Sequence, residues 1–387
     1  AITLGISNIL SSSRIMAMAW GENYSATIQQ AIEGDVTDNI PASFLQLHNH
    51  TRIALDLPAA ESLTRISHPW KVTSCEWTDK LIRRAIVWLC EQTGKPILKL
   101  TNKDYTDWGL GELVALYVSA YNVNIKVFNE LQHTITGWPG GKPDADDTYR
   151  PERANPYPKR VIVFSPHPDD DVISMGGTLQ RLVDQKHDVH VAYETSGNIA
   201  VGDEDMMRYF LMMDRIAPMF GFETESYKKL SADLHEFVAN KTPGEIDTKD
   251  IREIKTMIRQ AEATIACTYI GVKRDHIHFL HLPFYETGTI TKGDLGERDV
   301  NIVKNLIESV KPHQIFLAGD LADPHGTHRV CTDAVLAAID ELKGEEWMKD
   351  CRIWMYRGAW AEWEIDHIEM AVPMSPEQLR SKRNSIL

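Results

Sequence analysis

A run of four apolar residues, Val161–Phe164, constrains the fold of this chain more than any other stretch. Side chains along a strand point alternately to its two faces, so a continuous apolar run indicates a strand buried on both faces, as in a parallel sheet covered by helices. The run leads into a turn, His167–Asp171, that carries one imidazole and three carboxylates, and a helix is expected over 172–185. Open α/β sheets place their ligand sites at this end of a parallel strand.

The alternation of strand and helix continues to the end of the chain. Strands are expected at 160–165, 189–194, 277–282, 314–318 and 352–356, and helices at 172–185, 206–220, 246–268, 300–310 and 330–342. This order predicts an α/β fold with a Rossmann-like, doubly wound, mostly parallel sheet over residues 159–387.

Two further parts are expected before this sheet. Residues 1–70 read as a partial α/β unit, with strands near 15–20 and 51–55, and residues 71–158 as a helical connector with a Gly- and Pro-rich linker. The linker aspartates Asp144, Asp146 and Asp147 lack the remaining spacing of an EF-hand, so a solvated linker is preferred to a calcium loop.

Charge and cysteine usage narrow the class of partner. A net charge of −14 argues against nucleic acid or an anionic membrane as the main partner and leaves a small-molecule substrate. We expect no membrane insertion and no signal peptide, because no apolar run approaches about 18 residues and no basic segment precedes an apolar one. Five scattered cysteines, never in C-x-x-C spacing, favour a reducing, cytoplasmic location. The start at Ala1 suggests a fragment, and homo-oligomer formation is left open.

A second polar cluster, His325–His328, follows the expected strand 314–318. Loops that follow parallel strands open on one edge of the sheet, so this cluster and the His167–Asp171 turn are expected to face each other. Two histidines and one aspartate would form a three-ligand metal site with an open position, and a spare carboxylate beside it would act as general base. The simpler alternative is that Asp170 and Asp171 only stabilise the start of helix 172–185. Two clusters, each after a strand, favour the metal site.

These motifs resemble the PIG-L/LmbE family of zinc-dependent N-deacetylases. The resemblance covers about 225 residues and rests on P-H-P-D-D-D at residues 166–171, directly after the first strand, and on the downstream H-x-x-H at residues 325–328. It implies zinc, or another divalent ion such as iron or cobalt, held by His167, Asp170 and His328. It also implies that Asp169 is the general base and that His325 stabilises the intermediate or protonates the leaving amine.

Other residues near the motif and along the chain also have expected roles. The resemblance gives Asp171 a supporting role and places Thr327 where many members have aspartate. Arg208 is a candidate substrate-binding residue, with a solvated helix face as the alternative. His276 and His278 share one face of a strand, and a structural role is preferred for them.

The first part of the chain resembles the C-terminal portion of the glucosamine-6-phosphate deaminase/isomerase family. The residues that carry this resemblance are Thr3–Ile6, Arg14–Met16, Gly21–Asn23, Ala31–Gly34 and Leu45–His48. The family's catalytic carboxylates and histidine precede the matching segment, and Tyr24 stands where the family has a phosphate-binding lysine.

Together these features predict a zinc-dependent hydrolase that removes the N-acetyl group from an N-acetylglucosamine-type amino sugar or its conjugate. Two alternatives remain: a glucosamine-6-phosphate deaminase/isomerase-related protein, and a non-catalytic sugar-phosphate-binding module.

Overall fold

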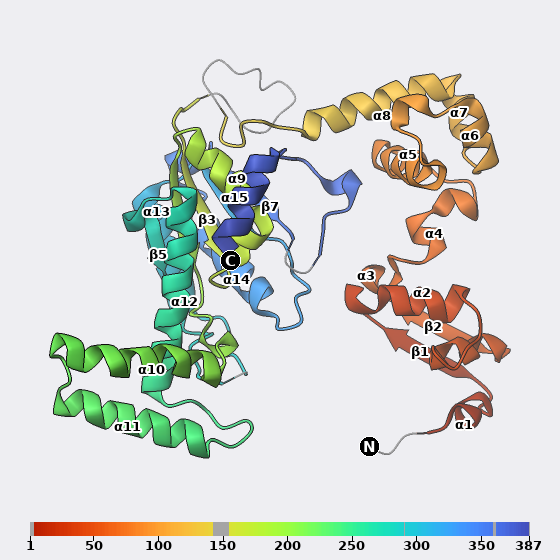
Figure 1. Cartoon of the computed structure of the whole chain (residues 1–387). Helices are drawn as coiled ribbons and strands as arrows, with labels where there is room; N and C mark the ends of the chain where they lie inside the picture. The colour runs from red at the N-terminus through yellow and green to blue at the C-terminus, as the bar shows by residue number, and fades with distance from the viewer. Residues whose placement is uncertain (1–3, 142–154, 290, 359–360, 387) are drawn as a thin grey trace. The chain divides into compact units, whose positions relative to one another are not determined.

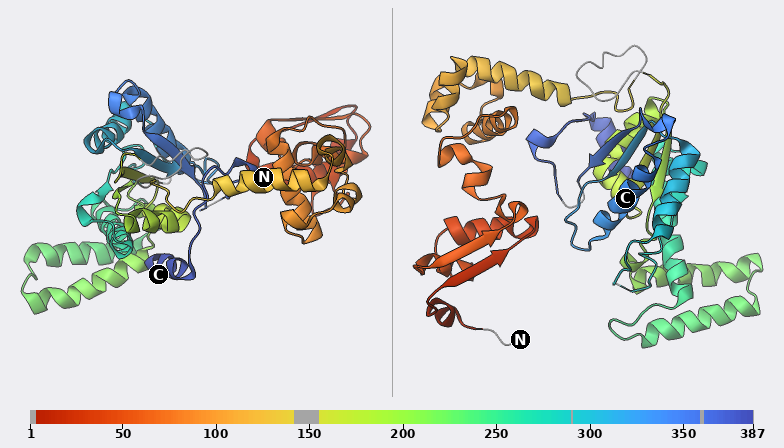
Figure 2. Two further views of the ribbon diagram at one scale, coloured as in Figure 1. Left: turned by 90° about the horizontal axis from the view of Figure 1, so that it is seen from above. Right: turned by 180° about the vertical axis from the view of Figure 1, so that it is seen from behind.

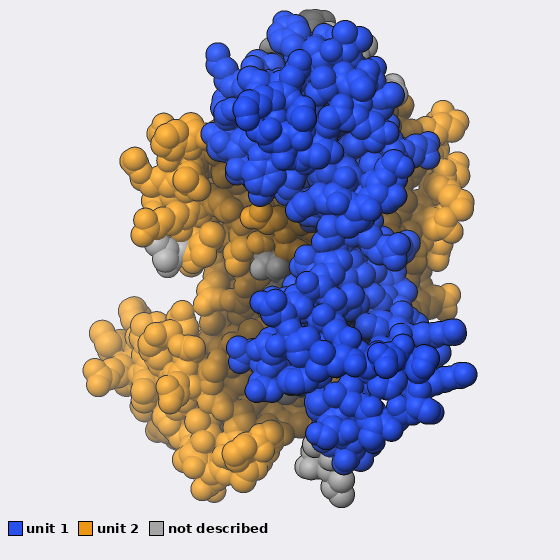
Figure 3. Space-filling view, turned by 90° about the vertical axis from the view of Figure 1, so that its right-hand side faces the viewer, with its two compact units in different colours: residues 1–134, 363–369 blue, residues 135–362, 370–387 orange. Residues whose placement is uncertain are grey.

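The computed structural model describes residues 4–141, 155–289, 291–358 and 361–386 (Figure 1). The chain divides into two compact units, coloured separately in Figure 3. Unit 1 consists of residues 1–134 and 363–369, and unit 2 of residues 135–362 and 370–387. The three-part division at 70 and 158 stays a prediction, and the linker aspartates Asp144, Asp146 and Asp147 lie outside the described residues.

Unit 1 begins with a two-stranded parallel sheet. Strand β1 (Ile15–Ala19) pairs with β2 (Thr51–Leu55) in register, Ile15 opposite Thr51. The short helices around it are α1 (Ile6–Leu10), α2 (Ser25–Glu33), α3 (Leu57–Ala60) and α4 (Thr64–Ser67). Burial along β1 alternates, and Met16 and Met18 are 65% and 62% exposed. One face of this sheet is therefore open to solvent in the structure.

The rest of unit 1 is helical and has its own apolar core. Its main helices are α5 (Asp79–Thr93), α6 (Asn102–Asp107), α7 (Gly111–Tyr117) and α8 (Ala120–Thr134). Residues from all four helices, among them Ile86, Tyr105, Leu113 and Val127, pack in one cluster. These four helices lie within residues 71–158, for which a helical connector was expected.

Unit 2 contains the predicted parallel sheet. Its strands are β3 (Arg160–Ser165), β4 (Asp188–Tyr193), β5 (Ile277–Phe279), β6 (Gln314–Ala318) and β7 (Arg352–Tyr356). All four pairings are parallel, and the order across the sheet is β5-β4-β3-β6-β7. The α/β fold class is thereby confirmed. The order of strands reverses between β3 and β6, which is where ligands bind in sheets of this kind.

Helices cover both faces of this sheet, as the apolar run predicted. Helices α9 (Asp170–Asp184) and α12 (Lys249–Ile270) pack on the face that carries Val161 and Val163. Helices α13 (Glu297–Val310) and α14 (Thr327–Leu342) pack on the opposite face, against Ile162 and Phe164. The C-terminal helix α15 (Pro376–Ile386) contacts α9 and α12. All four apolar residues of the run are fully buried.

A pair of helices inserted between β4 and α12 differs from the sequence prediction. Helix α10 (Asp203–Phe220) was expected, but α11 (Glu225–Asn240) was not. The two lie side by side in every view (Figures 1 and 2) and share a small core with the start of α12, including Met206, Phe210 and Leu234. The apolar residues of α11 recur at helical spacing but are separated by many charged ones, which obscured the pattern.

Among the described residues, we find no helix with the length and apolar character that a membrane crossing requires.

Candidate active site

The two loops singled out in the sequence follow neighbouring strands. The His167–Asp169 turn comes directly after β3, and the loop that ends at Gly326 comes after β6, which pairs with β3. Both loops lead into helices, α9 and α14, so the first residues of these helices also face the reversal point. The structure therefore brings together two segments that lie about 150 residues apart, because parallel strands deliver their following loops to one edge.

The three residues predicted as metal ligands converge at this edge. The Oδ2 atom of Asp170 lies 3.1 Å from Nδ1 of His167 and 3.2 Å from Nε2 of His328. One ligand atom from each residue falls within 4.8 Å of the others. The backbone N–H of His167 also donates to Asp170 Oδ2, at 2.9 Å, which fixes the carboxylate in the turn.

Burial and charge at this cluster fit a divalent metal ion. Asp170 is 4% exposed and His328 is 1% exposed. Burial alone would raise the pKa of Asp170, but its hydrogen bonds to His167 and His328 hold it below its usual range. Nδ1 of His328 is buried without a hydrogen-bond partner among the described residues. Since a buried polar atom without a partner is costly, and imidazole and carboxylate are favourable ligands, this donor set suits a metal.

Asp169 points to a different partner. Its carboxylate accepts a hydrogen bond at 2.8 Å from the guanidinium of Arg259 on α12, and its side chain is 41% exposed. It makes no capping hydrogen bond at the start of α9, which argues against a purely structural reading of this turn. The loop after β4 packs closely on this turn at Gly197. A Cβ atom at this position would lie 2.7 Å from Pro168 Cδ, and the backbone has φ +64°, so the position requires glycine.

Arg259 was missed in the sequence. It lies in a helix about 90 residues after Asp169, and its guanidinium also pairs with Glu262 one turn later. An arginine and a glutamate three residues apart form an ordinary ion pair on a solvated helix. The contact between Arg259 and Asp169 can therefore be seen only in the folded structure.

Asp171 is directed away from the metal cluster. It is fully buried, and its carboxylate accepts hydrogen bonds from the Tyr193 hydroxyl at 3.0 Å and from the Cys267 thiol at 3.6 Å. Burial raises the pKa of Asp171 to about 6, although these hydrogen bonds oppose the shift. Its contacts agree with a supporting role in the turn.

Glu194 is a second buried carboxyl group that the sequence analysis did not single out. It follows β4 directly and is 1% exposed, with Oε1 unpartnered among the described residues. Burial, with the nearby charge of Asp170, raises the pKa of Glu194 to about 8. The sequence could have indicated Glu194, because it directly follows the strand next to β3. Ligand sites form at the carboxyl ends of parallel strands, and this rule identified the other two loops.

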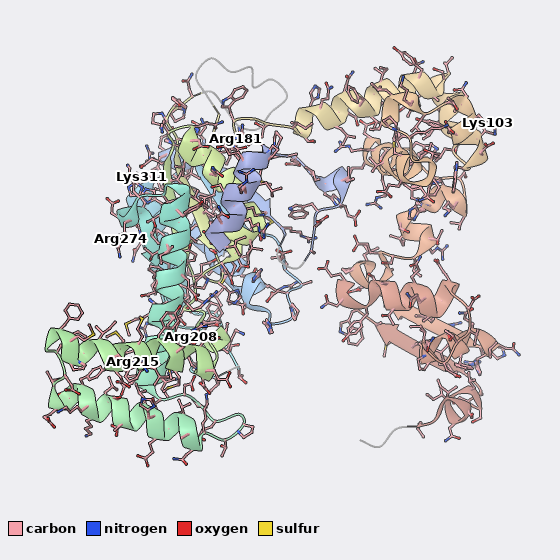
Figure 4. The ribbon with its side chains drawn as sticks, viewed as in Figure 1. Lys103, Arg181, Arg208, Arg215, Arg274 and Lys311 are labelled. Carbon is pink, nitrogen blue, oxygen red and sulfur yellow. The ribbon has the colours of Figure 1, made fainter. Side chains whose placement is uncertain are left out.

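The remaining predicted residues occupy less enclosed positions. His325 is exposed in the loop before α14, whereas Thr327 is fully buried and its N–H donates to the Asp323 carboxylate at 3.0 Å. Arg208 projects from α10, is 72% exposed, and pairs with Asp205 (Figure 4). Its role in substrate binding stays a prediction.

A cavity of about 490 Å³ is lined by residues of α12 and of the loops that follow β4 and β5. Its lining includes Asn198, Arg252, Gln260, His281 and Glu286. Gln260 follows Arg259 in α12, and Glu286 accepts the Ser196 N–H at 3.2 Å beside the glycine that packs on the His167–Asp169 turn. The lining of the cavity is therefore largely polar.

Comparison with known families identifies this sheet. Residues 162–339 match the PIG-L family, described as GlcNAc-PI de-N-acetylase. These residues form a PIG-L family domain. The match includes both loops of the site, so His167, Asp170 and His328 all belong to the PIG-L domain.

Two matches to known proteins include residues outside the PIG-L domain. A protein of Bacteroides thetaiotaomicron named as glucosamine-6-phosphate deaminase-like is 64% identical over 390 residues, covering 100% of this chain and 59% of that protein. Glucosamine-6-phosphate deaminase of Lacticaseibacillus paracasei is 42% identical over 65 residues, 17% of this chain and 28% of the enzyme, in the N-terminal region. The chain thus spans less than two thirds of either relative.

Among solved structures, N,N'-diacetylchitobiose deacetylase from Pyrococcus horikoshii aligns with a TM-score of 0.34 and 17% identity, covering 59% of this chain and 71% of that one.

Proposed function

We propose that the PIG-L domain is a metal-dependent amide hydrolase that removes the N-acetyl group from an N-acetylglucosamine-type amino sugar or its conjugate. The observation that carries this proposal is the convergence of His167, Asp170 and His328 at the reversal point of the sheet, with Asp169 in the same turn. The family match supports the class of reaction, and the amino sugar follows from the deaminase-like relatives of the N-terminal region.

His167, Asp170 and His328 would hold the ion, which we propose to be zinc, although the same ligands suit iron or cobalt. A bound divalent ion would polarise the acetyl carbonyl and lower the pKa of water.

The side chains of the chain itself would move the protons. Asp169 is exposed enough to reach a water molecule and would accept its proton as the oxygen attacks the carbonyl carbon. The ion pair with Arg259 would hold the Asp169 carboxylate in one orientation. His325 would donate a proton to the nitrogen as the C–N bond breaks, so that the products are acetate and a free amine.

A deaminase-related function is the second candidate, because the N-terminal region is 42% identical to a named glucosamine-6-phosphate deaminase. It would release ammonia without a metal. A non-catalytic sugar-phosphate-binding module is the third, and would bind sugar with Asp169 replaced. We also propose a cytoplasmic location, supported by the five free cysteines.

The deciding experiment measures acetate and ammonia separately. Purified protein is chelated, reloaded with zinc, and given N-acetylglucosamine, its 6-phosphate and diacetylchitobiose. The proposal expects acetate only from the reloaded protein, and none from His167→Ala. His235→Ala is the matched control, since His235 pairs with Asp214 on α10 away from the cluster. Ammonia that appears without metal would favour the deaminase, and sugar binding without either product would favour the binding module.

A further inference from the structure

A second group of histidines lies on the sheet at strands β4 and β5. Asp188 and His190 are two residues apart on β4, and His276 and His278 are two residues apart at the start of β5. Because successive strand residues alternate between faces, each pair projects to one side. Pairing of Val191 with Ile277 and of Ala192 with His278 then brings the two pairs together.

The side chains of this group are in close contact. The Asp188 carboxylate lies 3.4 Å from His276 Nδ1 and 3.7 Å from His190 Nε2. One ligand atom each from Asp188, His190 and His276 falls within 4.8 Å of the others. Neighbouring ligand atoms around a tetrahedral ion, with bonds of about 2.0–2.1 Å, are separated by about 3.3 Å. The observed separations approach this value.

We propose that Asp188, His190 and His276 form a second divalent transition-metal site. Two ring nitrogens and one carboxylate make a donor set suited to zinc, nickel or copper. His278 supports this site from behind, because its Nε2 lies 3.0 Å from Nδ1 of His190 and so leaves Nε2 of His190 directed at Asp188.

The charges around the group suit a cation. Asp188 provides negative charge, and Lys273, 3.7 Å away, competes for it when no ion is bound.

An ion can reach this group, and its arrival requires a small rearrangement. Asp188 and His276 line a cavity of about 550 Å³. The rings of His190 and His276 stack with centroids 4.0 Å apart and planes 8° apart. Two parallel rings cannot both lie edge-on to one ion, so one ring rotates about its Cβ–Cγ bond when the metal binds.

The second site is separate from the proposed active site. His190 and Glu194 are four positions apart along β4 and the residue that follows it, a distance of about 13 Å in an extended chain. In Figure 4, Arg274, which begins the turn that ends at His276, lies at the end of α12 opposite to Arg208. A metal here would join the three-residue edge strand β5 to β4 and stabilise the edge of the sheet.

Metal content of full-length variants tests the proposal. Chelated protein is reloaded with excess zinc, desalted and analysed by elemental mass spectrometry. We expect about two zinc ions per chain in the wild type, about one in His276→Asn and in His167→Ala, and none in the double variant. His235→Ala, which disrupts a His–Asp pair with no second histidine ligand, keeps the wild-type content.

A second readout separates this proposal from the proposed function. Zinc is expected to raise the melting temperature of His167→Ala but not of the double variant, with circular dichroism confirming that both are folded. Equal zinc content in wild type and His276→Asn would overturn the second site. Zinc that is lost with His276→Asn but not with His167→Ala would instead overturn the active-site metal alone.

Discussion

Strands β3 and β1 are both short, parallel, and followed by a polar turn and a helix, yet their surroundings differ. Strand β3 has neighbours on both sides and helices on both faces, and Val161–Ser165 are buried. Strand β1 pairs only with β2 among the described residues, and Met16 and Met18 are exposed. A polar turn therefore becomes a candidate site where its strand has neighbours on both sides and its sheet is covered by helices on both faces.

The carboxylates near the two strands illustrate the difference. Asp170, after β3, meets two imidazoles. Asp56, after β2, accepts the Gly21 N–H with both oxygens at 3.2 Å and caps α3 through Ala59 N–H at 2.9 Å. The same functional group thus meets two imidazoles in one sheet, whereas in the other it contacts backbone N–H groups.

The largest effect is expected at the turn after β3. Asp169→Asn should lower kcat for acetate release by about 10²–10⁴, because an amide cannot accept the proton of the attacking water. Glu22→Gln, at the corresponding turn after β1, should leave kcat unchanged. Metal content of Asp169→Asn should match the wild type, since Asp169 is not a proposed ligand. A kcat equal to that of the wild type in Asp169→Asn would contradict the role of Asp169 as general base.

The next largest difference between the two strands is expected in the free energy of unfolding. Phe164→Ala should lower the free energy of unfolding of unit 2 by about 3–5 kcal/mol, because the residue is fully buried. Met16→Ala, at an exposed position of β1, should change stability by less than about 0.5 kcal/mol. Urea unfolding followed by circular dichroism measures both. A large loss from Met16→Ala would mean that the open face of β1 is covered in solution.

The pH dependence of stability should also differ. The folded pKa of Glu194 is raised to about 8, so the native state binds a proton that the unfolded state has released. The stability linked to this bound proton is fully present below the ordinary glutamate pKa. It is lost as pH rises toward 8, by at most about 1.4 kcal/mol per pH unit. Asp104 in unit 1 behaves oppositely, because its hydrogen bond from Lys95 lowers its pKa to about 2.

Urea unfolding of the chelated protein from pH 6 to pH 8 measures this slope. Glu194→Gln should flatten it, since glutamine does not titrate. A slope equal to that of the wild type would contradict the assignment to Glu194.

The smallest effects are expected at matched helix caps. Thr78 caps α5 in unit 1 through Leu81 N–H at 3.2 Å, and Thr248 caps α12 in unit 2 through Ile251 N–H at 3.4 Å. Each threonine-to-alanine change should cost about 1 kcal/mol. If the units unfold separately, calorimetry should show each change in its own transition. A shift of both transitions by either variant would show that the units unfold together.

The sequence predicted those parts of the site that depend on local order. His167, Asp170 and His328 could be grouped because each follows an apolar run, and parallel strands place such loops on one edge. Arg259 could not be found this way, because its contact with Asp169 depends on how α12 lies across the sheet. His190 was overlooked for a related reason, since its partners belong to another strand and only the register joins them.

The path of the chain between its two units has a consequence for how they can be separated. Residues 363–369, which include the short helix Ile365–His367, belong to unit 1 although the chain on either side belongs to unit 2. The polypeptide therefore passes between the units three times. A single protease cut after α8 would leave the pieces associated through this returning segment. An isolated unit 2 must therefore either omit these residues or carry them without their packing partners.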